Sequence, residues 1–184
     1  MLPKRRMRIR EVSSSGGFEP RIVGFVCNWG AYSGIEVAGN RQIEYPANVH
    51  LIRVMCLGRV HHGLVLRAFE MGADGVILLG CPSGQCRYRS GIEQTKAMVA
   101  QVKRMLNMLG MGSKRIHLVE VPAGDGEFAA RRITAFVKRT QEMGPSPVKY
   151  VPKQPELAHE LTSLLESSSK PYPSPIPAGT EKAP

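Results

Sequence analysis

The sequence predicts a three-layer α/β domain, with a flavodoxin-like, four-stranded parallel sheet and helices on both faces. Between residues 21 and 144, apolar β-branched runs of strand type alternate four times with amphipathic patterns of helical spacing. Such alternation is typical of a parallel sheet, because each return to a parallel strand needs a crossover helix. The expected strand order of a doubly wound sheet of this kind is 2-1-3-4.

Each predicted strand is short and apolar, and each predicted helix ends at a glycine or a polar turn. The expected strands cover residues 21–26, 49–55, 75–79 and 115–121. The expected helices cover residues 29–38, 61–71, 92–109 and 125–142, with Asn28 as the N-cap of the first. We expect this α/β domain to span residues 21–144, between a basic flexible tail (1–20) and a proline-rich tail (145–184) with a short amphipathic piece at 157–165.

Composition and charge restrict the class of partner. The formal charge is +10, of which residues 1–20 carry a net +3 and residues 21–144 a net +7. A basic surface fits nucleic acid, an acidic protein or simply water. Nucleic acid is disfavoured, because no run interleaves aromatic with basic residues as a single-strand-binding platform does.

The location expected for the chain is the cytoplasm. No stretch approaches the roughly 18 apolar residues of a membrane span, and the basic N-terminus is not followed by the apolar core of a signal peptide. In a reducing compartment, four cysteines are expected to be ligands or redox groups rather than disulfides.

The four cysteines fall where such a sheet would gather them. Cys27, Cys56 and Cys81 stand at the predicted C-terminal ends of three successive strands, and Cys86 lies in the loop after the third. In the order 2-1-3-4 these strands are neighbours about 5 Å apart, and their C-terminal ends share one edge. The four thiols are therefore expected to converge.

Converging thiols have three main uses. Zinc prefers close C-x-x-C pairs, which this sequence lacks. A redox dithiol uses two cysteines and leaves two unexplained, whereas an iron–sulfur cluster is commonly held by four thiolates from scattered positions. The spacing favours a cluster and leaves zinc and simple buried or redox thiols open.

Nearby residues each have a functional and a structural interpretation. Arg59 and Arg87 either offset thiolate charge and form a docking face, or are solvated surface arginines. Trp29 and Tyr32 either shield the thiol site from water or pack the first helix on the sheet. The pair His61-His62 would suit a Rieske-type centre, but neighbouring residues point apart, so we interpret them as the start of a helix.

Three segments resemble a known family: Val26-Cys-Asn-Trp-Gly-Ala-Tyr32, Arg53-Val-Met-Cys-Leu-Gly-Arg59, and Gly75 to Cys81 followed by Gly84-Gln-Cys-Arg-Tyr88. In matching order over residues 21–144, they are similar to the delta subunit of methyl-viologen-reducing hydrogenase. The resemblance implies a 2Fe-2S cluster on Cys27, Cys56, Cys81 and Cys86. One departure is Gly30, where that family usually has a second cysteine after C-N-W.

The function implied is that of an electron-transfer protein with no substrate chemistry of its own. It would relay electrons between two modules of a larger complex. One is an oxidoreductase of hydrogenase, formate dehydrogenase or methylenetetrahydrofolate-reductase type, and the other is the flavin-containing A subunit of a heterodisulfide reductase-like complex. The alternative prediction is a structural zinc-binding module that tethers the subunits of a complex.

Overall fold

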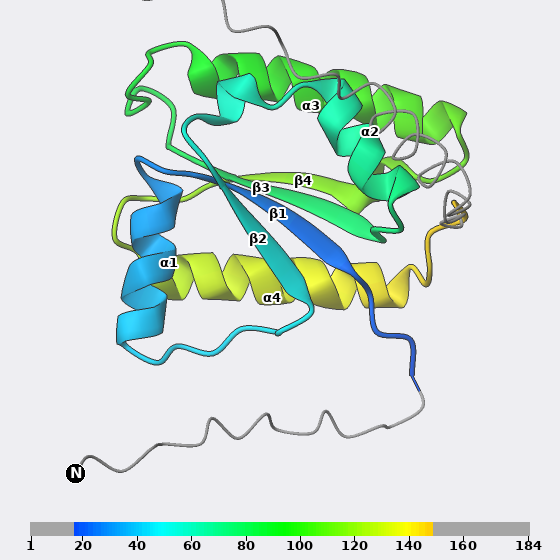
Figure 1. The fold of residues 1–184 in the computed structure, drawn as a ribbon, viewed down its shortest axis with the longest axis horizontal. Helices are drawn as coiled ribbons and strands as arrows, with labels where there is room; N and C mark the ends of the chain where they lie inside the picture. Colours follow the sequence, from blue (N-terminus) through cyan, green and yellow to red (C-terminus); the bar gives the residue numbers. More distant parts are fainter. Residues whose placement is uncertain (1–16, 149–184) are drawn as a thin grey trace, which may run out of the picture. The chain divides into compact units, whose positions relative to one another are not determined.

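The computed structural model describes residues 17–148, and these form the three-layer α/β domain that the sequence predicts (Figure 1). The four strands are parallel in the order β2-β1-β3-β4, as predicted. The elements are β1 (Ile22–Cys27), α1 (Ala31–Asn40), β2 (Val49–Val54), η1 (Leu57–Arg59), α2 (His62–Glu70), β3 (Gly75–Gly80), α3 (Gly91–Met108), η2 (Ser113–Arg115), β4 (Ile116–Glu120) and α4 (Gly126–Glu142).

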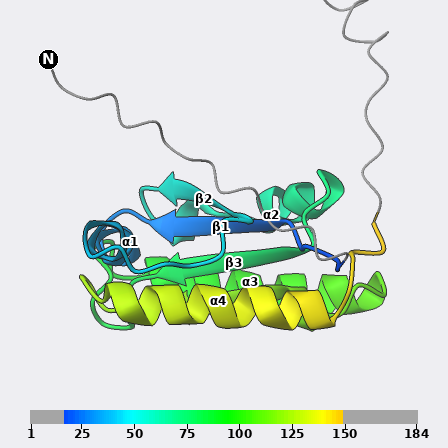
Figure 2. The ribbon, with the colours of Figure 1, turned by 90° about the horizontal axis from the view of Figure 1, so that it is seen from below.

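Helices cover both faces of the sheet because alternate strand residues point to opposite sides. On one face α2 and α3 pack through Val65, Phe69, Val102 and Leu106 against Phe25, Val76 and Leu78. On the other, α1 and α4 pack through Ala31, Ile133, Phe136 and Val137 against Ile22, Ile77 and Leu79. Figure 2 views the domain from the α4 side. All six residues of β3 are buried, as expected for a central strand of a parallel sheet.

The strand register gives the sheet two chemically different edges, which we call the carboxyl edge and the amino edge. At the carboxyl edge, Cys27 ends β1 opposite Val54 of β2, and Gly80 of β3 lies opposite Glu120 of β4. The segments 28–30, 55–61 and 81–90 leave the sheet here. At the amino edge the strands begin, and α3 and α4 end.

The amino edge is held by a buried charged pair, Asp74 and Arg115. The Asp74 carboxylate accepts hydrogen bonds from the backbone amides of Arg21 and Ser146, at 2.9 and 2.7 Å. The Arg115 guanidinium donates to four backbone carbonyls, those of Met111, Asp74, Gly144 and Pro145. Because every polar group of the pair has a partner, this edge closes the domain where the chain enters and leaves it.

Several predicted boundaries differ from the observed ones by one or two residues. The prediction that Asn28 caps the first helix is wrong, because α1 begins at Ala31 after Gly30 and has no side-chain cap. The amide of Asn28 instead donates to Val54 O and continues the ladder between β1 and β2. The predicted tails fall largely outside the described residues, and the amphipathic piece at 157–165 falls entirely outside them.

Candidate functional site

The four cysteines lie together at the carboxyl edge, each placed by a different element. Cys27 is the last residue of β1, Cys56 precedes η1, and Cys81 follows β3 directly. Cys86 lies in the loop between β3 and α3. The first three are buried and Cys86 is partly exposed, so the site is inside the protein but close to its surface.

The thiols are arranged as two pairs. The sulfurs of Cys27 and Cys81 are 3.4 Å apart. Cys56 and Cys86 form the second pair, since a Cβ atom built on Gly91 would lie next to both of their sulfurs. The pairs are near each other, because Cys81 interacts electrostatically with both Cys56 and Cys86. The fold therefore brings the four thiols together, as the sequence predicts.

Two glycines leave room for these sulfurs. A Cβ atom on Gly91, the first residue of α3, would collide with Cys56 Sγ and lie 3.1 Å from Cys86 Sγ. A Cβ atom on Gly30 would lie 3.1 Å from Cys81 Sγ. Position 30, where the sequence departs from the family pattern, thus points at the Cys27–Cys81 pair, so that a cysteine there would add a thiol to this pair.

Burial makes two of the thiols, those of Cys81 and Cys56, poor acids with raised pKa values. Burial raises the pKa of Cys81 to about 12, helped by its hydrogen bond with Cys27 and by the neighbouring thiols. Burial also raises the pKa of Cys56, although the hydrogen bond donated by Gly58 N, 3.4 Å from the sulfur, works in the opposite direction. A bound cation that replaces the protons would remove this cost, because metals bind thiolates and release protons.

The donor set fits a metal centre in one respect and differs from a single-ion site in another. Tetrahedral coordination with metal–sulfur bonds of about 2.3 Å separates two sulfurs on one metal by roughly 3.8 Å, close to the Cys27–Cys81 distance of 3.4 Å. Yet within residues 17–148 no three His, Cys, Asp or Glu side chains are grouped around one point in the way that a single ion requires.

A polar network fixes the loop that carries Cys86. Glu120, the last residue of β4, accepts from the Ser83 amide at 2.6 Å and from the Ser83 hydroxyl at 3.0 Å. Lys96 of α3 pairs with Glu120 at 2.9 Å and also contacts Ser83. This pairing lowers the pKa of Glu120 and raises that of Lys96. The same loop holds Arg89 at φ 59, a conformation uncommon for a non-glycine residue.

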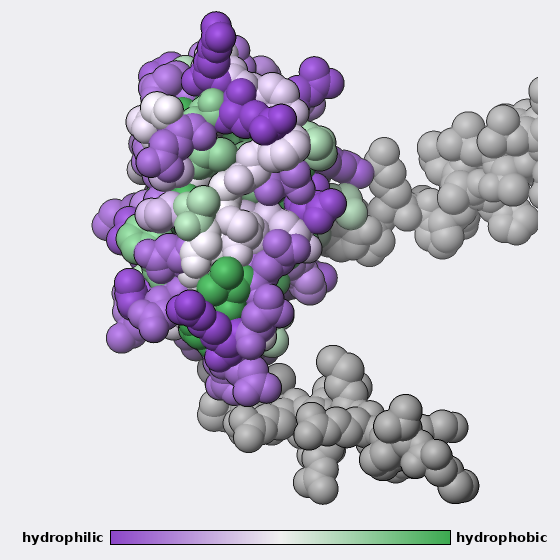
Figure 3. Space-filling view, turned by 90° about the vertical axis from the view of Figure 1, so that its left-hand side faces the viewer, coloured by the Kyte–Doolittle hydropathy of each residue, from purple (hydrophilic) through white to green (hydrophobic). Residues whose placement is uncertain are grey.

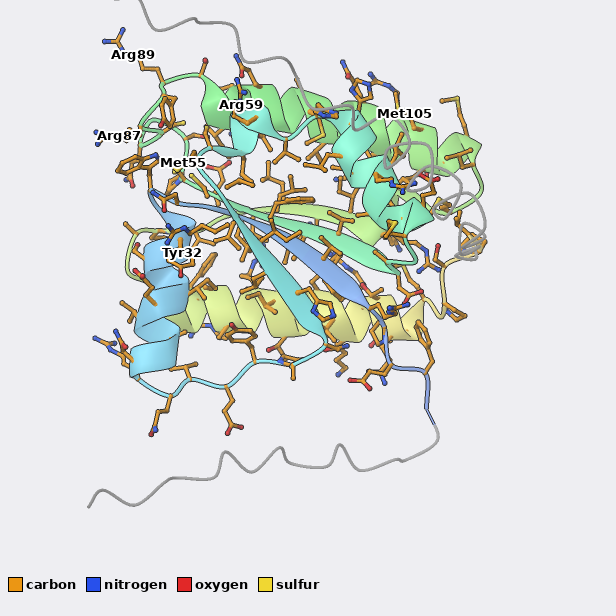
Figure 4. The ribbon with its side chains drawn as sticks, viewed as in Figure 1. Tyr32, Met55, Arg59, Arg87, Arg89 and Met105 are labelled. Carbon is orange, nitrogen blue, oxygen red and sulfur yellow. The ribbon has the colours of Figure 1, made fainter. Side chains whose placement is uncertain are left out.

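The other predicted site residues lie on segments near the carboxyl edge, and Figure 4 shows Arg59, Arg87 and Tyr32 at this end of the domain. Arg59 lines a hollow of about 350 Å³ that also has Cys56 and Gly91 in its wall. The Arg87 guanidinium stacks on the Trp29 ring at 4.1 Å, and Trp29 is 40% exposed. Trp29 therefore does not pack the first helix against the sheet. Tyr32 does have this packing role, because it lies against the α1–α4 core while its ring contacts Arg53.

His61 and His62 lie at the start of a helix, as the sequence predicts. His61 caps α2, accepting a hydrogen bond at Nδ1 from the Leu64 amide at 3.3 Å.

Sequence reasoning missed two features of the site. The first is the contact of Gly91 with both sulfurs of the second pair, and the only signal was a glycine at the start of a helix. The second is the support that Glu120 and Lys96 give to the Cys86 loop. The signal here was a carboxylate at the end of the fourth strand, which the parallel topology places beside the end of the third.

The fold and the site together define a class of protein: a small α/β domain with two facing thiol pairs at the carboxyl edge of its sheet. Residues 22–144 match the family model of the methyl-viologen-reducing hydrogenase delta subunit. Because the match covers more than half of the chain, the protein belongs to this family, and the resemblance noted in the sequence is confirmed.

Curated relatives support the assignment over nearly their full lengths. The chain is 37% identical over 132 residues to the iron-sulfur subunit of the vhc F420-non-reducing hydrogenase of Methanococcus voltae, covering 72% of this chain and 92% of that protein. It is 31% identical over 131 residues to the iron-sulfur subunit of the vhu F420-non-reducing hydrogenase of Methanocaldococcus jannaschii, covering 71% of this chain and 98% of that one.

A second kind of relative contains this domain within a larger chain. Over 138 residues, 75% of this chain is 36% identical to the A subunit of the ferredoxin/F420H2-dependent CoB-CoM heterodisulfide reductase of Methanosarcina acetivorans. The match covers 17% of that protein. The same domain thus occurs both as a separate hydrogenase subunit and within a heterodisulfide reductase subunit.

Over residues 17–148, no helix has the length and apolar character needed to cross a lipid bilayer.

Proposed function

We propose that this chain is an electron-transfer subunit whose thiols Cys27, Cys56, Cys81 and Cys86 hold a 2Fe-2S cluster. The observation that carries the proposal is the arrangement of the thiols in two adjacent pairs, Cys27 with Cys81 and Cys56 with Cys86. A 2Fe-2S cluster has two irons and four cysteine ligands, so each pair can serve one iron. The names of the relatives, which are iron-sulfur subunits, agree with this.

When bound, such a cluster would supply one-electron transfer, and the chain's own residues set the conditions for it. Cys27, Cys56 and Cys81 are buried, which keeps the centre away from bulk water. Cys86 and its loop are near the surface, which leaves a short path for electrons to a partner. No side chain is needed to make or break a substrate bond, so substrate chemistry belongs to the partners.

The partners proposed follow from the two kinds of relative. One is an oxidoreductase module of hydrogenase, formate dehydrogenase or methylenetetrahydrofolate-reductase type. The other is a heterodisulfide reductase-like A subunit, since the domain also occurs within such a chain. The protein would relay electrons between these two modules.

The experiment is metal analysis and spectroscopy of full-length protein purified without oxygen. We expect two irons and two labile sulfides per chain, with visible absorption bands that dithionite bleaches. Colourless protein with one zinc per chain would contradict the proposal and support the alternative, a structural zinc module. The paired thiols and the names of the relatives, which are iron-sulfur subunits, favour iron.

Single replacements Cys56→Ser, Cys81→Ser and Cys86→Ser test the ligand set. Each is expected to lose most of the bound iron while circular dichroism still reports the α/β fold, because the two cores on either side of the sheet are built mainly from apolar side chains of the strands and helices. Full iron retention in any of the three would remove that cysteine from the set.

The geometry at Gly30 permits a sharper test of Cys27. Cys27→Ser should lose iron, and the double variant Cys27→Ser/Gly30→Cys should recover much of it, since a thiol at position 30 can pair with Cys81. The matched control is Cys27→Ser/Gly39→Cys. This adds a cysteine to the helix that follows, where no described residue outside the backbone of the same helix and the two chain neighbours lies within 4 Å of the new Cβ, so no recovery is expected. Equal iron in both double variants would contradict the pairing of Cys27 with Cys81.

A further inference from the structure

The surface outside the thiols has an apolar centre. Trp29, Met55 and Tyr88 are 40%, 55% and 50% exposed, and they lie on three different segments that leave the carboxyl edge. Met55 and Tyr88 flank the hollow of about 350 Å³ that reaches Cys56. Large exposed apolar side chains gathered at one place mark binding surfaces more often than isolated ones do.

The margin of this surface is positively charged. Arg59, Arg87 and Arg89 are exposed there, and Figure 4 shows them at the same end of the domain as Met55. Within residues 17–148 none of the three makes an ion pair with a carboxylate. Arg87 instead stacks on Trp29. We call the six residues Trp29, Met55, Arg59, Arg87, Tyr88 and Arg89 the thiol face.

Carboxylates are missing from the segments that build this face. Residues 28–33, 55–61 and 81–90 contain no Asp or Glu. The nearest acidic groups along the adjoining elements, Glu93 and Glu120, are both paired with Lys96. Figure 3 views this end of the domain and shows pale and green residues in its middle with purple side chains around them. The positive charge of the face is therefore not neutralised within the described domain.

We propose that the thiol face is the docking surface for an acidic protein partner of the redox centre, a proposal that rests on the function proposed above. Trp, Tyr, Met and Arg are the residues that protein interfaces favour over the rest of the surface. Three arginines that make no ion pair within residues 17–148 would select a carboxylate-rich surface by charge complementarity and accelerate its approach. Docking here places the partner directly over Cys56 and Cys86, on the short path that electron transfer needs.

A protein fits this face better than a nucleic acid. The apolar centre is divided among Trp29, Met55 and Tyr88, and Trp29 is already covered on one side by Arg87, so no open row of rings offers a stacking platform for successive bases. Small interfaces with an apolar centre and a charged margin are typical of transient electron-transfer complexes.

The experiment uses two redox probes of opposite charge, rubredoxin as the acidic one and cytochrome c as the basic one. Full-length, cluster-loaded protein is reduced with dithionite, and its oxidation by each probe is followed in a stopped-flow instrument at low and high salt. With rubredoxin we expect the second-order rate constant to fall roughly tenfold as salt screens the attraction. With cytochrome c the rate constant should rise or stay level.

The variant Arg59→Gln/Arg87→Gln/Arg89→Gln should slow rubredoxin at low salt, accelerate cytochrome c, and lose most of the salt dependence. Using two probes separates docking from reduction potential, because a changed potential would move both rates in the same direction. The matched control Arg104→Gln/Lys114→Gln/Lys138→Gln removes the same charge near the amino edge and should behave like the unchanged protein. Each rate is normalised to the measured cluster content.

Two kinetic outcomes overturn the proposal. One is an equal effect of the two triple variants, which would mean that net charge rather than this face matters. The other is a parallel slowing of both probes by the first variant. Cluster content distinguishes these failures from failure of the proposed function, in which no cluster is present at all.

Equilibrium binding of rubredoxin to the immobilised full chain, by surface plasmon resonance, keeps the docking test available without a cluster. Salt-sensitive binding that the thiol-face variant loses would support the proposal, and no binding at low salt would overturn it. A competition experiment gives a further test. If a single-stranded DNA oligonucleotide displaces bound rubredoxin at a lower concentration than free rubredoxin does, the proposal is overturned in favour of a nucleic-acid surface.

Discussion

The two edges of the sheet are built from the same strands, yet they differ in whether their polar and charged groups have partners within the domain. At the amino edge, the buried pair Asp74 and Arg115 has all its hydrogen bonds satisfied by backbone groups. At the carboxyl edge, the buried thiols of Cys56 and Cys81 have raised pKa values, and exposed arginines have no carboxylate partner among the described residues. The hydrogen-bonding groups of the amino-edge pair are therefore satisfied within the domain, whereas the carboxyl edge is where we propose that a metal and a partner bind.

The largest effect on stability is expected at the amino edge, from Arg115→Ala. The change leaves buried carbonyls of Asp74 and Met111 without donors and the Asp74 carboxylate without its nearby cation. We expect a loss of about 3 kcal/mol in the free energy of unfolding, measured by urea denaturation.

Arg131→Ala is the matched control for that change. Arg131 is paired with Glu127 on the exposed side of α4, and both side chains are 66% exposed. Its loss should cost less than about 1 kcal/mol. Similar costs for the two arginine variants would contradict the view that the amino edge depends on a buried clamp.

The next largest effect is expected at the carboxyl edge, from Gly91→Ala. The added Cβ would collide with Cys56 Sγ and press on Cys86 Sγ, which displaces one thiol pair. We expect most of the bound iron to be lost, with a stability cost on the order of 1–3 kcal/mol typical of overpacking. Iron analysis and thermal unfolding measure the two effects.

Gly39→Ala provides the control within a helix. Apart from the backbone of its own helix and its two chain neighbours, no described residue lies within 4 Å of a Cβ built on Gly39, and alanine favours the helical state by up to about 1 kcal/mol over glycine. This variant should keep its iron and be slightly more stable. Iron loss in both glycine variants would point to a general effect of changing the helices rather than to crowding at the thiols.

A smaller, pH-dependent effect belongs to His117, near the start of β4. Burial lowers the pKa of His117 to about 4, with contributions from Arg139, Arg132 and Lys103 around it, and its ring stacks on Phe136 at 6.0 Å. Between about pH 4 and pH 6.5 the unfolded chain binds a proton that the folded chain does not, so stability falls as the pH is lowered through this window and is constant above it.

His117→Gln should therefore flatten that dependence. Because the ring is only half buried, we expect the difference in unfolding free energy between pH 7 and pH 4.5 to shrink by on the order of 1 kcal/mol, after allowance for solvent screening. An unaltered profile in His117→Gln would mean that its ring is not held neutral by the fold.

The smallest effect is expected from Glu120→Gln at the carboxyl edge. The amide keeps an oxygen that can accept from the Ser83 backbone but loses its charge pairing with Lys96. Since the network is largely exposed, little change in melting temperature is expected. Faster hydrogen exchange of the Ser83 amide should reveal a looser Cys86 loop, and Glu127→Gln, an exposed pair on α4, should leave that amide unaffected.

The sequence predicts the features of the fold that depend on local patterns better than those that depend on contacts between distant segments. The alternation of apolar runs with helical patterns predicts the parallel sheet and its order, because periodicity and crossover handedness are local or topological rules. It also brings Cys27, Cys56 and Cys81 to one edge. It fails at the start of α1, where Asn28 continues the β-ladder instead of capping the helix.

By itself, then, the sequence determined the fold, the family motifs and the edge at which the thiols meet. Only the tertiary structure decided that these thiols form two pairs, that Gly91 and Gly30 face the sulfurs, and that Arg87 covers Trp29. The physical reason is that side-chain pairing depends on the packing of loops that are distant in the chain. A difference of one or two residues in a loop moves a sulfur by several ångströms without changing the hydrophobic pattern.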